Sequence, residues 1–113
     1  MRLLAVLFLP ALALGDVTFE KEIKPILEDY CFDCHADGAS KGDFSMDEYD
    51  ELSGHLDDVD HWLAVWRNVR SQIMPPPKKD QPDLVEKRQL MGWIEKRVFK
   101  LDPENPDPGR VTI

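Results

Sequence analysis

The two cysteines of this chain stand three residues apart, in the run Cys31-Phe32-Asp33-Cys34-His35, and a histidine follows the second of them. C-x-x-C-H is the attachment motif of covalently bound haem. Each thiol can add to one vinyl group of the porphyrin, and the adjacent imidazole of His35 can then bind the iron as the proximal ligand. The motif therefore predicts one covalent haem c, held by thioether bonds to Cys31 and Cys34.

Three other uses of these side chains compete with haem attachment. A Cys31–Cys34 disulfide would close so short a loop that it would add little stability. A thioredoxin-like redox pair would need a strand–helix–strand context, which the sequence does not suggest. A zinc site would need a fourth ligand beyond the two cysteines and His35, and only His55 or His61 could complete that set with a histidine. Haem attachment accounts for all five positions and is the leading interpretation.

Haem iron in an electron carrier usually has a second protein ligand, and a methionine in that place raises the reduction potential. Met74 is our candidate, because the three prolines that follow it predict a stiff loop that would present its sulfur. We expect Met46 to fill a gap under a loop and Met91 to pack in a helix core. His55 and His61 are the alternative ligands for this position.

The first fifteen residues, MRLLAVLFLPALALG, have the parts of a secretory signal peptide: one positive charge, an apolar run and small residues at the exit. The apolar run is shorter than the roughly 20 residues that span a bilayer, so we expect cleavage after Ala13 or Gly15 rather than a membrane anchor. Haem c is attached outside the cytoplasm, which agrees with export. The sequence thus predicts an extracytoplasmic domain, periplasmic or secreted.

The length of 113 residues suits one domain, and the formal charge of −8 limits its partners. Nucleic acids and anionic membrane surfaces are bound through Lys and Arg, so this acidic balance argues against both. We expect a domain over residues 16–101 and a proline-rich tail over 102–113. A polar loop at 36–57 leaves little apolar surface, and domains this small usually carry a staple such as a cofactor.

Three stretches carry apolar side chains at helical spacing. The first leads into Cys31, and Pro25 marks either a kink in its helix or the place where the helix begins. The second begins within residues 57–60, where aspartates offer N-caps, and must end before the proline run. The third runs from about Pro82 to Lys100.

The apolar side chains of these three stretches define the expected core. Trp62 and Trp66 would face either the haem or, by default, the other helices. Without a strand-rich stretch, the sequence predicts an all-α fold of three or more helices around one small core. The expected inner faces are Phe19, Ile23, Ile26, Leu27 and Tyr30, then Val59, Trp62, Leu63, Trp66, Val69 and Ile73, then Leu84, Met91, Ile94 and Val98, with Leu90, Trp93 and Leu101 at the flank of the last.

The order of these features along the chain resembles that of class I cytochromes c: a first helix with Phe19, the cysteine motif, the Met74 loop, and a final helix with Gly92-Trp93-Ile94. The resemblance implies helices wrapped around one covalently bound haem, with Phe19 packed against the Gly92–Trp93 region. It also implies electron transfer rather than catalysis.

A narrower resemblance covers residues 17–101, which look like the planctomycete-type cytochrome c domain. It is carried by Phe19-x-x-x-Ile23-x-Pro25-Ile26-Leu27, by Cys31-Phe32-Asp33-Cys34-His35, by Lys41-Gly42 and by the Met-Pro-Pro loop. Relatives commonly have leucine near Met46, which implies a packing role there. In such relatives a stretch like Pro-Gly-Arg-Val-Thr precedes larger domains, so the tail implies that this is the amino-terminal module of a longer protein.

The predicted function is one-electron transfer by a haem with His35 and Met74 as axial ligands, to a redox partner protein or a tethered domain. A haem with an open distal site, acting on peroxide or as a sensor with His55 or His61 over the iron, is the alternative from another class. A haem-free module stapled by a disulfide or zinc is the third. The sequence shows no nucleophile–base pair or carboxylate dyad that would indicate an independent enzyme.

Overall fold

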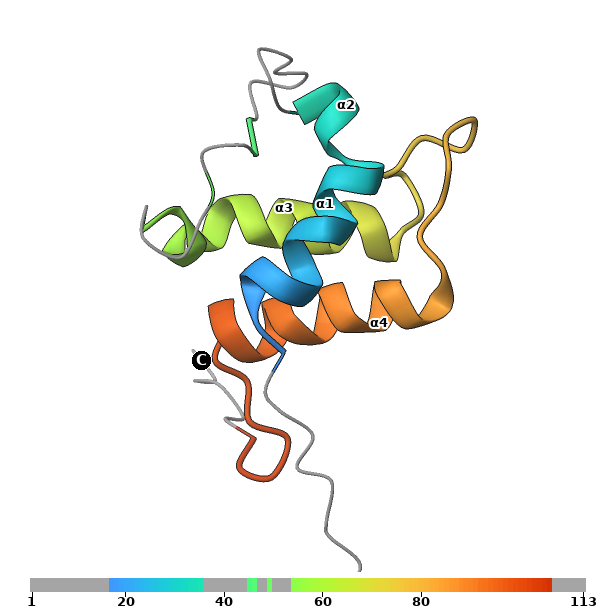
Figure 1. Ribbon diagram of the computed structural model, residues 1–113. Helices are drawn as coiled ribbons and strands as arrows, with labels where there is room; N and C mark the ends of the chain where they lie inside the picture. Colours follow the sequence, from blue (N-terminus) through green and yellow to red (C-terminus); the bar gives the residue numbers. More distant parts are fainter. Residues whose placement is uncertain (1–16, 36–44, 47–48, 50–53, 107–113) are drawn as a thin grey trace, which may run out of the picture.

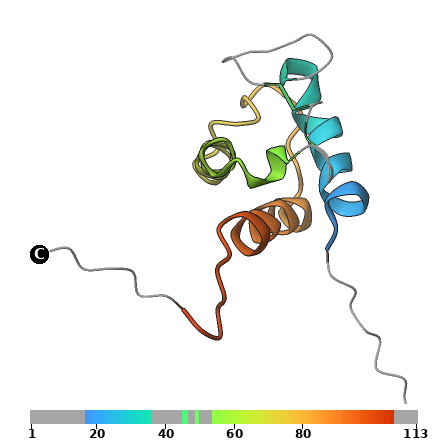
Figure 2. The same cartoon turned by 90° about the vertical axis from the view of Figure 1, so that its left-hand side faces the viewer.

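The computed structural model of the chain describes residues 17–35, 45–46, 49 and 54–106. Within these ranges the chain is helical and has no strand, which confirms the predicted all-α class. Helices α3 and α4 lie side by side and α1 crosses them (Figures 1 and 2). None of the described helices has the length and apolar content of a membrane span. The predicted signal peptide, the Lys41-Gly42 pair and the end of the tail lie outside the described residues.

The first helical segment leads directly into the cysteine motif. One π-helical turn, η1 (Phe19–Ile23), continues into α1 (Lys24–Tyr30), and the short α2 (Phe32–His35) follows. Pro25 is the second residue of α1, directly after the π-helical turn, whose closing hydrogen bond runs from the N–H of Lys24 to the carbonyl of Phe19. Of the two predicted roles for Pro25, the structure shows the helix start.

Helix α3 (Val59–Arg70) begins at one of the predicted aspartate caps. The carboxylate of Asp58 accepts a hydrogen bond from the backbone N–H of His61 at 3.3 Å, which satisfies one of the donors left unpaired at a helix start. The helix ends at Arg70, and Gln72 then has a left-handed backbone with a φ of 62°. This turn comes before the proline run, so α3 ends earlier in the chain than the prolines alone would make it end.

The buried face of α3 differs from the predicted one at four positions. Leu63, predicted on the inner face, is only half-buried and lies outside the core. Val59 is 47% exposed because it is the first residue of the helix, and Ile73 is 58% exposed because it lies beyond the last. Val65, which the periodicity left out, is buried in the core. Trp62 and Val69 are buried as predicted.

Helix α4 (Leu84–Trp93) begins two residues later than predicted, after Pro82 rather than at it. Asp83 is the N-cap and forms a capping box with Glu86: each carboxylate accepts the backbone N–H of the other residue at 2.8 Å. A π-helical turn, η3 (Ile94–Val98), continues the helix. Lys100 then takes a left-handed conformation with a φ of 55°, so the predicted end near Lys100 is confirmed.

The inner face of the last helix is rotated from the predicted one. Leu90 and Trp93, expected at its flank, are buried together with Ile94 and Val98. Leu84 is 62% exposed, and Met91 is only half-buried at the edge of the core. The rotation follows from Trp93, whose large ring packs among the aromatic side chains of the other helices.

Aromatic rings join the helices at the centre of the core. The ring of Phe19 lies 5.3 Å from that of Trp93 and 6.3 Å from that of Trp62, and the two tryptophan rings are 5.1 Å apart. These tilted and edge-to-face arrangements are favourable for aromatic pairs. The contact that the resemblance implied between Phe19 and the region of Trp93 is confirmed. Trp66 also faces the helices, and its indole N–H donates to Glu95 at 2.9 Å.

Candidate functional site

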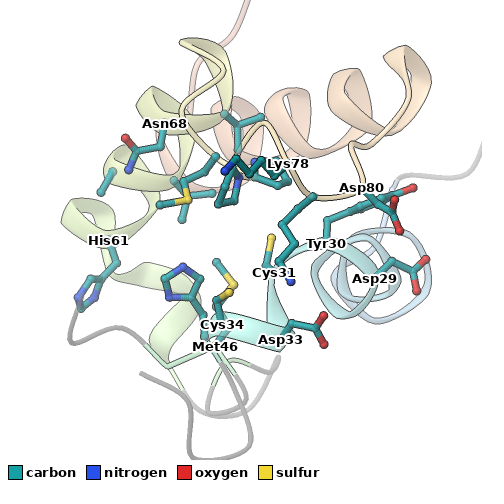
Figure 3. A pocket seen from close by; sticks show the side chains of 18 residues that line it. Asp29, Tyr30, Cys31, Asp33, Cys34, Met46, His61, Asn68, Lys78 and Asp80 are labelled. Carbon is teal, nitrogen blue, oxygen red and sulfur yellow. The ribbon is translucent and has the colours of Figure 1, made fainter. Parts of the chain in front are cut away.

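A cavity of about 600 Å³ lies between the cysteine motif, one side of α3 and the proline loop (Figure 3). Its volume is within the range of cofactor pockets, and most of its wall is apolar. The apolar part of the lining consists of Met46, Ala64, Val65, Val69, Met74, Pro75 and Pro76.

Both cysteines and His35 line this cavity. The N–H of Cys31 donates to the carbonyl of Leu27 at 2.8 Å, which completes the last turn of α1. The carbonyl of Cys31 in turn accepts from the N–H of Cys34 at 3.2 Å and of His35 at 3.0 Å. This tight turn brings the three side chains to one side of the backbone, and Figure 3 shows Cys31 and Cys34 at the cavity. Both thiols are free, as thioether attachment requires.

The environment of Cys31 bears on the competing uses of the motif. Burial raises the pKa of the Cys31 thiol to about 11, and the neighbouring Cys34 adds to the rise. The thiolate, not the thiol, is the nucleophile of disulfide exchange, so a raised pKa disfavours a thioredoxin-like role. Among the described residues, no three or more His, Cys, Asp or Glu side chains form a group that could hold a metal ion. The zinc and thioredoxin-like interpretations therefore lack support.

Met74 reaches the same cavity through a turn at the end of α3. The carbonyl of Asn68 accepts the N–H of Ile73 at 3.0 Å and the N–H of Met74 at 3.1 Å. The left-handed conformation of Gln72 allows the chain to fold back in this way. The side chain of Met74 lines the cavity while the residue is 37% exposed, and the following Pro75 is buried.

Met46 also lines the cavity. It is 3% exposed, so the predicted packing role is confirmed, and it lies beside Cys34 in Figure 3. Its backbone N–H donates to the carbonyl of His35, which ties it to the cysteine motif. Met91 does not line this cavity; it borders a separate groove between α3 and α4. Of the alternative methionines, only Met46 is therefore placed near the predicted ligands.

The alternative histidines are less well placed. His61 lines the edge of the cavity from the first turn of α3, and about half of its side chain is exposed. Its Nδ1 contacts the carboxylate of Asp58 and lies 3.0 Å from the hydroxyl of Tyr49. These contacts hold the ring at the margin of the cavity, where Figure 3 shows it. The side chain of His55 lies outside the described part of the chain.

Several cavity residues were missed by the sequence analysis. The hydroxyl of Tyr30 donates to the carboxylate of Glu86 at 2.9 Å, which joins α1 to the capping box of α4 and raises the pKa of Tyr30. Asn68 projects from α3, and Lys78 and Lys79 extend from the proline loop. Helical periodicity places Tyr30 on an inner face, but it distinguishes only buried from exposed positions and not cavity from core, so it does not identify these four residues as cavity lining.

The described residues fit a covalently held haem. They combine two free thiols at the C-x-x-C spacing, an imidazole, a thioether on the far wall and an apolar lining in one cavity of suitable size. Imidazole and thioether are established axial donors for haem iron. Lys78 and Lys79 of the loop also line the cavity and could pair with the carboxylates that haem carries.

Comparison with known proteins agrees with this assignment of the cavity. Residues 31–78 match the sequence profile of a family described as planctomycete cytochrome C. The matched segment begins at the first cysteine and ends in the proline loop, so it contains all four predicted haem-binding residues: Cys31, Cys34, His35 and Met74. Neither the curated proteins nor the solved structures contain a match to the chain.

Proposed function

We propose that this chain, which carries a planctomycete-type cytochrome c domain, transfers single electrons through one covalently bound haem c. The observation that carries the proposal is the convergence of two free thiols, one imidazole and one methionine on a single apolar cavity. When bound, the haem supplies the redox couple, and the domain itself transforms no substrate.

In this proposal the cysteine motif provides one wall of the site and the attachment. Cys31 and Cys34 hold the porphyrin through thioether bonds, and His35 provides the proximal imidazole. The hydrogen bonds that the Cys31 carbonyl accepts from Cys34 and His35 fix the relative positions of these three residues before the cofactor is attached. Preorganised ligands of this kind bind without a further cost of ordering.

Met74 is the proposed distal ligand, and the hydrogen bonds distinguish it from Met46. Met46 is bonded through its backbone to His35, so it lies on the side of the proximal residue. Met74 comes from the opposite wall, where its N–H is bonded to the carbonyl of Asn68 at the end of α3. A haem held by His35 would therefore be met by Met74 from another wall of the cavity, which favours Met74 over Met46 as the second ligand.

The remaining lining residues would exclude water and set the potential. Val65 and Val69 from α3, and Pro75 from the loop, give the cavity an apolar wall. A thioether ligand and a dry pocket both favour the reduced iron, so we propose a potential higher than that of a haem with two histidine ligands.

An open distal site for peroxide chemistry is the competing arrangement. It would require a base above the iron, and the only described candidate is His61, whose ring is engaged by Asp58 and Tyr49 at the cavity edge. The geometry therefore favours electron transfer over this alternative.

Cytochrome c domains are typically extracytoplasmic, and we propose that the predicted signal peptide exports this one. Its partner would be a redox protein, or a domain tethered in a longer chain, that is docked weakly and transiently. The formal charge of −8 favours a partner with a basic docking face.

The experiment is expression of the full chain in cells that have the machinery for attaching haem c. We expect haem that survives extraction with acidified acetone, a reversible one-electron titration, and the weak long-wavelength absorption band of a methionine–iron bond. The double variant Cys31→Ser/Cys34→Ser should retain no haem. Haem that is extracted from the wild-type chain, or a wild-type spectrum without the methionine band, would contradict attachment or ligation respectively.

A further inference from the structure

The side-chain amide of Gln81 lies against the carbonyl groups of the proline loop. Its Nε2 donates to the carbonyl oxygens of Pro75 at 3.1 Å, Pro76 at 3.0 Å and Lys79 at 3.1 Å. Within the same loop the N–H of Lys79 donates to the carbonyl of Pro76 at 2.9 Å. One side chain thus gathers three backbone acceptors spread over five residues.

The composition of the loop explains why it needs an external donor. Prolines have no N–H, so residues 75–77 bring three carbonyls and no backbone donor to the turn. The amide of Gln81 has two N–H groups, which three nearby carbonyls share. Its orientation is also determined, because only the nitrogen, and not the carbonyl oxygen of the amide, can face three acceptors.

A second anchor holds the other end of the loop. The carbonyl of Asn68 accepts the N–H groups of Ile73 and Met74, which fixes the backbone of Met74 to the end of α3. Gln81 fixes the residues that follow, beginning with the buried Pro75. Met74 therefore stands between two anchored segments, on the wall of the cavity.

We propose that Gln81 is a positioning residue for Met74: its amide closes the proline loop and so holds the methionine at the cavity. The part that concerns iron rests on the proposed function; the part that concerns the loop does not. Without these hydrogen bonds the three loop carbonyls would turn to water, the loop would open more often, and the thioether would leave the cavity more often.

Two variants of Gln81 separate the amide's donors from its size and charge. Gln81→Leu keeps a side chain of similar size without donors, and Gln81→Glu keeps the shape but offers only acceptors to three carbonyls. Gln89→Glu is the matched control: it makes the same change of charge on α4, where the side chain of Gln89 makes no hydrogen bond with the described residues.

The first measurement is a titration of the oxidised, haem-loaded full chain with imidazole, in which the loss of the methionine–iron absorption band reports binding. Imidazole can bind only when Met74 has left the iron, so its apparent affinity reports how often the loop opens. Loss of hydrogen bonds of this kind predicts an affinity about tenfold higher in both Gln81 variants. Gln89→Glu should bind imidazole like the wild type, and thermal unfolding should be similar in all four proteins.

The second measurement is hydrogen exchange at the backbone amides of Ile73 and Met74, which reports the loop whatever the iron ligands are. Faster exchange in both Gln81 variants, and not in Gln89→Glu, supports the positioning role. The proposal is overturned if the exchange rates and the imidazole affinity of both Gln81 variants equal those of the wild type. It is also overturned if Gln81→Glu and Gln89→Glu change these two quantities equally. If the wild type lacks the methionine–iron band while exchange responds to Gln81, the proposed ligation is wrong and the loop closure by Gln81 stands.

Discussion

The aromatic contact at the crossing of the first and last helices allows a quantitative test of the fold. Phe19 is fully buried and packs on the rings of Trp62 and Trp93. Phe19→Ala leaves a cavity where these three segments meet, and truncation of a buried phenylalanine costs about 3–5 kcal/mol. Aromatic pairs add about 0.5–1.5 kcal/mol beyond the buried area, so we expect the upper half of that range.

The assay is urea-induced unfolding of the haem-loaded chain, followed by circular dichroism. A loss of about 4 kcal/mol would be a large fraction of the roughly 5–15 kcal/mol that stabilises a domain of this kind. Phe99→Ala is the control, because the half-buried Phe99 contacts only the edge of the core, 6.2 Å from the ring of Trp66. A Phe19→Ala loss below about 1 kcal/mol, or one no greater than that of Phe99→Ala, would refute the predicted helix crossing.

Three further predictions concern the site and its supports. Met74→Ala should abolish the methionine–iron band and lower the potential, whereas Met46→Ala should keep the band and cost about 2–5 kcal/mol of stability; the opposite pattern in absorption spectra would reverse the assignment. Asp83→Ala removes the cap of α4 and should cost about 1 kcal/mol in urea unfolding, and an unchanged midpoint would contradict the capping box. Before haem is attached, the thiol of Cys31 should react slowly with iodoacetamide at pH 8 and faster as the pH approaches its raised pKa of about 11. The Cys31 thiol of the unfolded chain loses its proton near its ordinary pKa, before the thiol of the folded chain does. The contribution of this thiol to the free energy of unfolding is therefore lost as the pH rises from about 9 to 11. Rapid alkylation at pH 8 would contradict the buried environment.

The sequence predicted most of the helices because local rules determine where they begin and end. The aspartate cap of α3 and the helix start at Pro25 follow from groups within a few residues. The C-x-x-C-H motif needs no tertiary information, since the tight turn at Cys31 brings its side chains together. These features were therefore readable from the spacing of residues alone.

The errors lie where tertiary packing decides. Val59 and Ile73 fit the helical period, but one is the first residue of α3 and the other lies beyond its end, so neither reaches the core. The rotation of the last helix depends on the fit of Trp93 among rings from two other segments. Periodicity cannot choose between two neighbouring apolar stripes when both contain large side chains.

The position of Met74 depends on both kinds of information. The proline run predicted a stiff loop, but stiffness does not say where a loop points. Its direction comes from Gln72, whose left-handed backbone turns the chain back, and from the carbonyl of Asn68, which accepts two N–H groups in that turn. A glutamine is not the residue expected at a left-handed position, where glycine fits without strain, so this turn could not be predicted from the residue types. Met74 therefore reaches the cavity because α3 ends at Arg70, three residues before the proline run would force it to end. The turn at the end of the helix determines the direction of the loop, and the prolines then stabilise that direction.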